Sequence, residues 1–328
     1  MAAAAALPSH ADAAAAPEAD TPVLSVNNLT FGYDKDAPVL RDINIKMHRG
    51  DRLLLVGDNG AGKTTLLRLL AGKHMHAAGA VQILGRDSFF DTMLDNHRSY
   101  MGSDWGRRTV AFAGYGCALQ ADVKVSEMML PLQRSFTERR EMLIDLLGVN
   151  LEWRMHQVSD GQRRRVQLFL QLLRPVEVLL LDEITTDLDV ITRADFLEFL
   201  KREAEDHGTT IVYATHIFDG LAEWFTHVAY IEDGTVARQM HRDECTDFQE
   251  RLKAGDTAPL LRTIETWLRA DKDRKRAARL AAAAAAGKAL PLGSDEADSG
   301  GKDRTSMAAG QGNGFSAGRM AAYISMTE

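Results

Sequence analysis

Short, continuous runs of apolar residues recur along this chain at wide intervals. The runs at 53–56, 178–181 and 211–214 are uninterrupted by polar side chains, which is typical of strands buried on both faces of a parallel sheet. Leucines at helical spacing over 63–71 follow the first run, and a second helix is expected over 190–204. This alternation of strands and helices predicts an α/β fold with a mostly parallel core sheet.

Two regions depart from the parallel pattern. Residues 24–31 and the run 81–84, which is followed by Gly85, have β character and predict short strands outside the parallel pattern. Residues 109–119 are expected to return to the main sheet. Over about 122–174 the methionines and leucines have helical spacing without a strand signal, so we expect a helical subdomain inserted into the α/β domain.

The C-terminal third begins with a hairpin signal. Alternating residues over 227–236 surround Asp233-Gly234, a two-residue turn that favours a hairpin closing the main sheet. Residues 246–280 are interpreted as a helical extension. Within it, a helix over 259–280 is expected to bury one apolar face, made by Leu261, Ile264, Trp267 and Leu268. Residues 281–328, which begin with an alanine run, are interpreted as a flexible linker and tail.

The composition fits one sizeable core. The 328 residues are 45% hydrophobic, and 39 basic against 46 acidic residues give a formal net charge of −7, which argues against a protein that wraps nucleic acid. Basic residues cluster after Trp267; RNA contact and nuclear import are alternatives there, but a solvated helix face is favoured. Cys117 and Cys245 have no metal-ligand or redox spacing and are expected to be reduced structural thiols.

No segment of the sequence has the length of a membrane span. The longest apolar stretch without charge, 109–121, is interrupted by two glycines and falls short of the roughly 20 residues required. The alanine-rich stretch 1–22 contains no Lys or Arg, unlike a signal or transit peptide. We therefore expect a disordered N-terminal tail on a soluble protein of the cytoplasm, with the nucleus as an alternative.

A phosphate-binding loop follows the first apolar run directly. The nine residues Gly57-Asp58-Asn59-Gly60-Ala61-Gly62-Lys63-Thr64-Thr65 stand between an expected strand and an expected helix. Glycines let the backbone curl so that its N–H groups converge on phosphates, the lysine adds a charge, and Thr64 is placed to hold Mg²⁺. The sequence therefore predicts that the chain binds a nucleoside triphosphate.

The second apolar run ends in two carboxylates, Asp182 and Glu183. At the end of a buried strand, the first is placed to hold Mg²⁺ and the second to orient and deprotonate an attacking water. Between this strand and the phosphate loop lies Val158-Ser159-Asp160-Gly161-Gln162. That segment resembles the Leu-Ser-Gly-Gly-Gln signature of ATP-binding-cassette (ABC) ATPases, with Val158 and Asp160 as departures.

The resemblance to ABC ATPases covers about residues 24–236, and we expect the nucleotide-binding domain to span 23–245. It implies a P-loop fold with an antiparallel β-subdomain, and it implies roles for further residues. Tyr33 is implied to stack on adenine, Gln120 to link Mg²⁺ and the attacking water to the helical subdomain, and His216 to contact the γ-phosphate. Asp189 is the last residue of a segment that resembles the D-loop. The implied ATP-binding residues are Tyr33, Gly57, Asn59, Gly60, Ala61, Gly62, Lys63, Thr64, Thr65, Ser159, Gly161, Gln162 and Asp189; the implied Mg²⁺ ligands are Thr64, Gln120 and Asp182; and the implied catalytic residues are Glu183, His216 and Gln120.

Departures from the general pattern match a narrower group. The segments 158–167, 182–185 and 213–221, with Ile184 where most ABC proteins have proline, resemble the soluble ABC proteins of fungi and plants. The fungal representative is associated with the carbon-catabolite-repression/NOT complex. The tail 313–320 also resembles that group and is interpreted as a docking segment.

The resemblance implies an ATPase that works with Mg²⁺ as a head-to-tail homodimer, in which each signature completes the other subunit's phosphate site. A regulatory ATPase bound to a gene-expression complex is favoured. The alternatives are the ATPase subunit of a transporter with a separate permease, and a nucleotide-dependent scaffold with little turnover. Asp160 either repels the γ-phosphate or pairs with one of Arg163, Arg164 and Arg165 and orders its helix.

Overall fold

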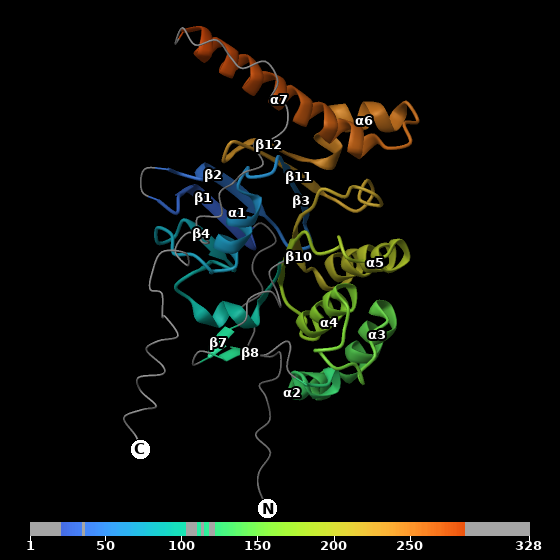
Figure 1. Ribbon diagram of the computed structural model, residues 1–328. Coiled ribbons are helices and arrows are strands. Elements are labelled where there is room, and N and C mark those ends of the chain that lie inside the picture. The colour runs from blue at the N-terminus through green and yellow to red at the C-terminus, as the bar shows by residue number, and fades with distance from the viewer. Residues whose placement is uncertain (1–20, 35–36, 103–109, 113–114, 118–121, 286–328) are drawn as a thin grey trace, which may run out of the picture. The chain divides into compact units, whose positions relative to one another are not determined.

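The computed structural model describes residues 21–34, 37–102, 110–112, 115–117 and 122–285 (Figure 1). The chain divides into two units after Lys275, and both large sheets lie within the first. The elements are, in chain order, β1 (Leu24–Phe31), β2 (Leu40–Met47), β3 (Arg52–Gly57), α1 (Lys63–Leu70), β4 (Val81–Ile83), β5 (Arg86–Asp87), η1 (Thr92–Asn96), β6 (Arg98–Met101), β7 (Val110–Phe112), β8 (Tyr115–Cys117), η2 (Val125–Glu127), α2 (Leu130–Ser135), α3 (Thr137–Leu147), α4 (Asp160–Leu172), β9 (Val178–Asp182), α5 (Val190–His207), β10 (Thr210–Ala214), β11 (His227–Glu232), β12 (Thr235–His241), η3 (Arg242–Glu244), α6 (Thr246–Lys253) and α7 (Pro259–Ala285).

The largest sheet confirms the predicted α/β fold. Its strand order is β12-β11-β3-β10-β9-β6, in which β11, β3, β10, β9 and β6 run parallel and β12 pairs antiparallel with β11. A second sheet, β2-β1-β4-β5, is antiparallel throughout, as predicted for the β-subdomain. The three apolar runs therefore form strands whose side chains are buried on both faces of the sheet.

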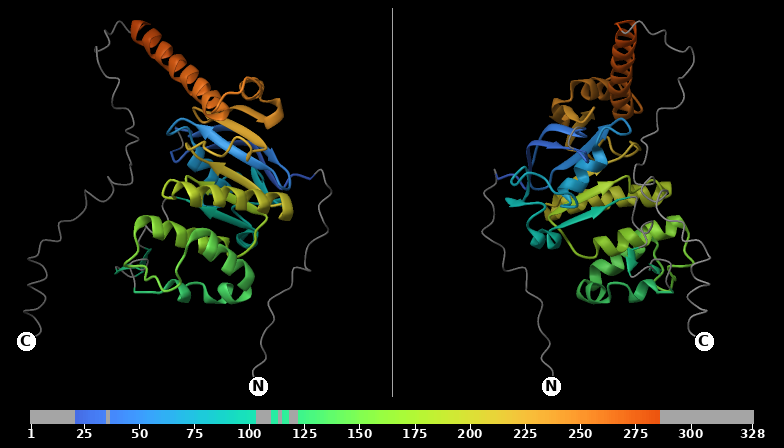
Figure 2. Two further views of the ribbon diagram at one scale, coloured as in Figure 1. Left: turned by 90° about the vertical axis from the view of Figure 1, so that its right-hand side faces the viewer. Right: turned by 60° about the vertical axis from the view of Figure 1, so that its left-hand side comes forward.

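Successive residues of the parallel strands enter two different cores. Leu53 and Leu55 of β3 pack with the leucines of α1 and with the antiparallel sheet, whereas Leu54 and Val56 pack with α3, α4 and α5 (Figure 2). Side chains alternate between the faces of a strand, so an unbroken apolar run supplies both cores at once. Each fully buried leucine contributes about 2 kcal/mol to these cores.

The expectation that residues 109–119 return to the main sheet is wrong. Within that range, β7 and β8 pair only with each other among the described strands. The main sheet is instead extended by β6, which pairs in parallel with β9. Its sequence, Arg-Ser-Tyr-Met, is mostly polar and lies at the sheet edge, so it has no apolar run to indicate it.

The C-terminal third contains the predicted hairpin, with β11 and β12 joined at Asp233-Gly234. In α7, Ile264 and Trp267 are buried as expected, but Leu261 is 45% exposed and its neighbour Leu260 is buried instead. The helix begins at Pro259, as expected, and its buried face is made by Leu260, Ile264 and Trp267, which are spaced four and three residues apart. The alanine run was also misjudged in part, because α7 continues to Ala285, as alanine's high helix propensity allows.

None of the helices in the described ranges combines the length and the apolar content that a bilayer crossing needs.

Candidate functional site

The phosphate loop leaves β3 and opens α1, as predicted. A Cβ on Gly57 would overlap the carbonyl oxygen of Ile231 in β11, and Gly62 has φ +107 with Leu40 Cδ2 only 2.6 Å from a Cβ placed there. Both positions therefore require glycine. No side chain caps the first turn of α1, so its N–H groups form the kind of helix N-terminus that binds anions.

Lys63 is held inside this loop. Its Nζ donates hydrogen bonds to the carbonyl oxygens of Gly57 at 2.9 Å and Asp58 at 3.0 Å. Burial lowers the pKa of Lys63, although the carboxylates of Glu183, Asp182 and Asp58 oppose that shift. The loop thus confines one ammonium group beside a cluster of negative charge, where a phosphate with bound Mg²⁺ would find a complementary field.

Asp182 ends β9 in a buried position beside α1. The Thr64 hydroxyl donates to its Oδ1 at 3.2 Å, and the Tyr100 hydroxyl donates to its Oδ2 at 3.2 Å. Burial raises the pKa of Asp182, with the Thr64 and Tyr100 hydrogen bonds acting in the opposite direction. A hydroxyl and a carboxylate are hard oxygen ligands, so the donor set of Thr64 and Asp182 fits Mg²⁺.

Glu183 follows Asp182 at a sharp change of backbone direction. It has φ +52 and its N–H donates to the Ala214 carbonyl at 2.9 Å; this conformation costs a non-glycine residue on the order of 1 kcal/mol. Strand register places Asp182 opposite Ala214, and His216 stands two residues beyond. His216 Nδ1 lies 2.6 Å from Glu183 Oε2.

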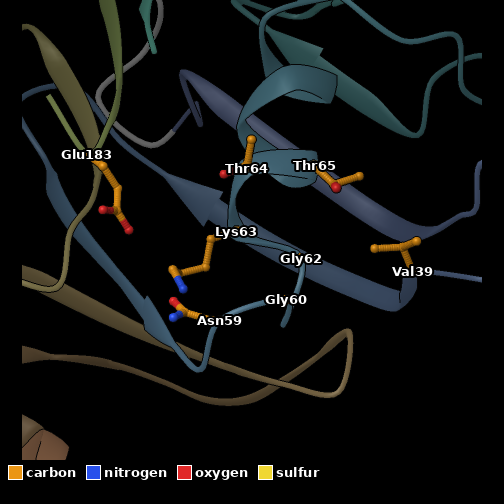
Figure 3. Close-up of a pocket in the computed structure, with 8 residues that line it drawn as sticks. All are labelled: Val39, Asn59, Gly60, Gly62, Lys63, Thr64, Thr65 and Glu183. Carbon is orange, nitrogen blue, oxygen red and sulfur yellow. The ribbon is translucent and has the colours of Figure 1, made fainter. Parts of the chain in front are cut away.

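A pocket brings the phosphate loop and Glu183 together (Figure 3). Figure 3 shows the Lys63 and Glu183 side chains reaching into it from opposite sides. Its lining consists of Val39, Asn59, Gly60, Gly62, Lys63, Thr64, Thr65 and Glu183. The sequence predicted that the loop and Glu183 serve one nucleotide site, but it did not indicate Val39.

Tyr33 stands beside this pocket with its ring accessible. The side chain is 57% exposed, and its hydroxyl lies 3.4 Å from Thr65 Oγ1. Phe31 and His74 both meet the Tyr33 ring edge-on, with centroids 5.3 and 5.4 Å away. Two rings therefore hold the tyrosine in place, and its position suits stacking on a base.

The signature residues lie at the start of α4. Ser159 caps the helix: its hydroxyl accepts from Gln162 N at 3.3 Å, and Gln162 Oε1 accepts from Ser159 N at 2.9 Å. Asp160 pairs with Arg163 at 2.7 Å, and a Cβ on Gly161 would meet the Asp187 carbonyl at 3.3 Å. None of these residues is among the described residues that line the pocket.

Two arginines of α4 tie it to the segment before α5. Arg165 lies 2.6 Å from Asp189, which caps α5 by accepting from Thr192 N at 2.9 Å, a bond that lowers the pKa of Asp189. Arg164 is buried and donates to the Gly102 carbonyl at 3.0 Å, with Asp187 at 3.3 Å. The signature helix and the D-loop segment therefore form one connected unit.

Two residues at the site, Tyr100 and Val39, were not predicted from the sequence, and the prediction for a third, Gln120, is not tested. Tyr100 holds Asp182 from β6, the strand that was not predicted, and Val39 lines the pocket from just before β2. Neither carries a local signal, because Tyr100 reaches the site through the pairing of β6 with β9, and Val39 reaches it from the segment that leads into the antiparallel sheet. Gln120 lies outside the described residues.

The sheet, the loop and the paired carboxylates define a P-loop nucleotide-binding domain. The profile of the ABC transporter family matches residues 40–186. The chain is 48% identical over 252 residues to ABC transporter I family member 21 of Arabidopsis thaliana, covering 76% of this chain and 86% of that protein. The chain therefore belongs to the ABC family, which confirms the resemblance read from its sequence.

A further relative and two solved structures are also similar to this chain, the structures in their fold. CCR4-associated factor 16 of Saccharomyces cerevisiae is 39% identical over 247 residues, covering 70% of this chain and 83% of that protein. The ATP-binding subunit of an ABC transporter superposes with a TM-score of 0.61 at 20% identity, covering 75% of this chain and 99% of that one. The dimeric structure of MJ0796, a bacterial ABC transporter cassette, gives 0.56 at 20% identity over 67% and 98%.

Proposed function

We propose that this chain binds Mg-ATP and hydrolyses it. The observation that carries the proposal is the pairing of Glu183 with His216 at 2.6 Å, at the edge of a pocket whose other side is the phosphate loop. A general base beside a phosphate-binding loop is the arrangement that hydrolysis of a nucleoside triphosphate requires.

Each part of the site has a role in this proposal. Loop N–H groups from 57–65 and Lys63 bind the β- and γ-phosphates, and Tyr33 stacks on adenine. Thr64, Asp182 and Gln120 hold Mg²⁺, which when bound neutralises the phosphate charge. Glu183 accepts the proton of the attacking water, and His216 keeps the Glu183 carboxylate oriented while facing the γ-phosphate.

The second half of each site is proposed to come from a second copy of the chain. Ser159, Gly161 and Gln162 do not line the pocket of their own subunit among the described residues. A head-to-tail homodimer would place the start of α4, with Asp189, against the partner's triphosphate, where a helix N-terminus stabilises anions. The MJ0796 cassette, which shares the fold, has a dimeric structure, and this supports the proposal of a dimer.

The Asp160–Arg163 pair supports the interpretation that Asp160 orders the signature helix. The Asp160 side chain is 90% exposed and 2.7 Å from Arg163. We expect Asp160→Gly to leave ATP-dependent dimerisation equal or weaker, by roughly twofold or less in dissociation constant, because exposed ion pairs are worth little. Sedimentation of both proteins at low and high salt measures this. Tighter dimerisation of Asp160→Gly at low salt would instead indicate repulsion of the γ-phosphate.

For the use of the ATP cycle, we propose a regulatory subunit of a gene-expression complex. The relationship to CCR4-associated factor 16 supports it, and nucleotide-driven closure is the type of change such a subunit would transmit. An ATPase subunit of a transporter is the second candidate, because the two Arabidopsis relatives are named ABC transporters.

Two measurements on the full chain test the proposal. Purified protein should release phosphate from ATP in a Mg²⁺-dependent manner, and no turnover at all would leave the scaffold alternative. Affinity purification of the tagged chain separates the two uses. Recovery of a polytopic membrane protein would favour a transporter, whereas recovery of RNA-decay or transcription factors would favour a regulatory subunit.

A further inference from the structure

The C-terminal helix α7 forms ion pairs with the end of β11 and the turn between β11 and β12. Arg274 lies 2.6 Å from both carboxylate oxygens of Glu232, and Lys275 Nζ lies 2.8 Å from Asp233 and 3.0 Å from Asp271. Oxygens of these three carboxylates lie within 4.8 Å of one another, so the two cations offset a mutual repulsion. We call these five residues the α7 clamp.

The clamp is anchored on the helix side by a buried group. Asp271 is 1% exposed, and the Tyr230 hydroxyl lies 3.5 Å from its Oδ2. A buried carboxylate is costly to leave without a cation, so we expect Lys275 to remain paired with Asp271. Because Lys275 also pairs with Asp233, it holds that residue of the turn near α7. The turn is therefore fixed to α7 rather than free in solvent.

Gly234 of the same turn contacts a residue that lines the nucleotide pocket. Gly234 accepts a hydrogen bond from Arg41 N at 2.7 Å, and a Cβ on Gly234 would overlap the carbonyl oxygen of Val39, a residue of the pocket lining. One residue before Glu232, the Ile231 carbonyl lies against Gly57 of the phosphate loop. The end of β11 and the turn therefore contact α7, the pocket residue Val39 and Gly57 of the phosphate loop.

Electrostatics supports the same connection. Burial raises the pKa of Tyr230, and the charges of Asp271, Glu232 and Asp58 add to the shift. Asp58 belongs to the phosphate loop, where its carbonyl oxygen accepts a hydrogen bond from Lys63. Charges of the clamp and of the loop therefore act on one buried hydroxyl.

We propose that the α7 clamp positions the nucleotide pocket, so that Arg274 and Lys275 set the affinity for Mg-ATP without touching it. The inference rests on the proposed nucleotide binding. Loss of both cations frees the turn and lets Val39 and Gly57 leave the geometry that the triphosphate needs. Coupling of this kind is reciprocal, so bound nucleotide also tightens the attachment of α7 to the turn.

The test compares two variants of the full chain that lose the same charges from the same helix. Arg274→Ala/Lys275→Ala removes the clamp cations. Arg269→Ala/Lys272→Ala is the matched control, because Arg269 pairs with Glu265 of α7 and Lys272 is exposed. Titration with Mg-ATP should give a dissociation constant raised roughly fivefold or more for the first variant, at the lower end of couplings between separate sites, and little change for the control.

Two further measurements separate positioning from support of the fold. Glu232→Arg alone should weaken binding, and adding Arg274→Glu should restore it. In the unmodified chain, Mg-ATP should slow hydrogen exchange of the α7 amides over 268–275. This second readout needs no substitution and therefore holds even if a variant does not fold.

Each outcome is decisive. A lower melting temperature of nucleotide-free Arg274→Ala/Lys275→Ala with an unchanged dissociation constant would overturn the inference and leave the clamp a structural contact. Unchanged exchange of α7 on nucleotide binding would overturn it as well. An unmodified chain that binds no Mg-ATP would contradict the proposed function, and the inference with it.

Discussion

Glu183→Gln is expected to lower ATP turnover by roughly 10²- to 10⁴-fold while nucleotide binding persists, because the amide keeps the shape of the side chain but cannot accept the proton. The substitution also changes the contact with His216, which lies 2.6 Å away. Phosphate release measured at saturating Mg-ATP gives the turnover. Glu198→Gln, a change of the same charge at an exposed position of α5, should retain the normal rate.

The same variant reports on the dimer. Binding without hydrolysis should trap the closed state, so sedimentation of Glu183→Gln with ATP should reveal a dimer that nucleotide-free protein lacks. Monomer alone at micromolar concentration would indicate that a different subunit completes the site. Turnover near normal would remove Glu183 from its role as the base.

Lys63→Ala is expected to abolish most of the stabilisation that Mg-ATP gives to the fold. At about 100 times the dissociation constant, a bound ligand adds roughly 2.7 kcal/mol, which raises the melting temperature by several degrees. The Lys63 ammonium is confined inside the loop by the carbonyl oxygens of Gly57 and Asp58, and alanine at this position removes that charge. Melting curves with and without Mg-ATP give the shift for each protein.

The difference between the two curves is the decisive quantity for Lys63→Ala. Losing the hydrogen bonds to Gly57 and Asp58 also changes the melting temperature of the nucleotide-free protein. Subtracting the melting temperature without Mg-ATP from that with Mg-ATP removes this contribution. Lys253→Ala, an exposed change on α6, should show the full shift. An undiminished shift in Lys63→Ala would remove the assigned phosphate loop from the binding site.

Local sequence patterns predicted the features that depend on adjacent residues. The phosphate loop, the strands of apolar runs and the carboxylates at the end of β9 are each contiguous, and all were found where expected. Such local patterns do not predict the order of strands in a sheet. Tyr100 reaches Asp182 because β6 lies beside β9, and nothing in a polar edge strand indicates its neighbour. The buried face of α7 was also predicted only in part, because Leu260 and Leu261 are adjacent apolar residues and both fit a helical spacing with Ile264 and Trp267.

The register between β9 and β10 sets the distance between Glu183 and His216. Asp182 stands opposite Ala214 in the parallel ladder, and Glu183 is bonded to Ala214 directly. A one-residue deletion inside β9 would move the carboxylate by about 3.3 Å and turn it to the other face. Insertions in the connections far from these strand ends would leave the spacing intact. Length variation among natural versions of this chain should therefore be confined to such connections, and β9 and β10 should keep their lengths.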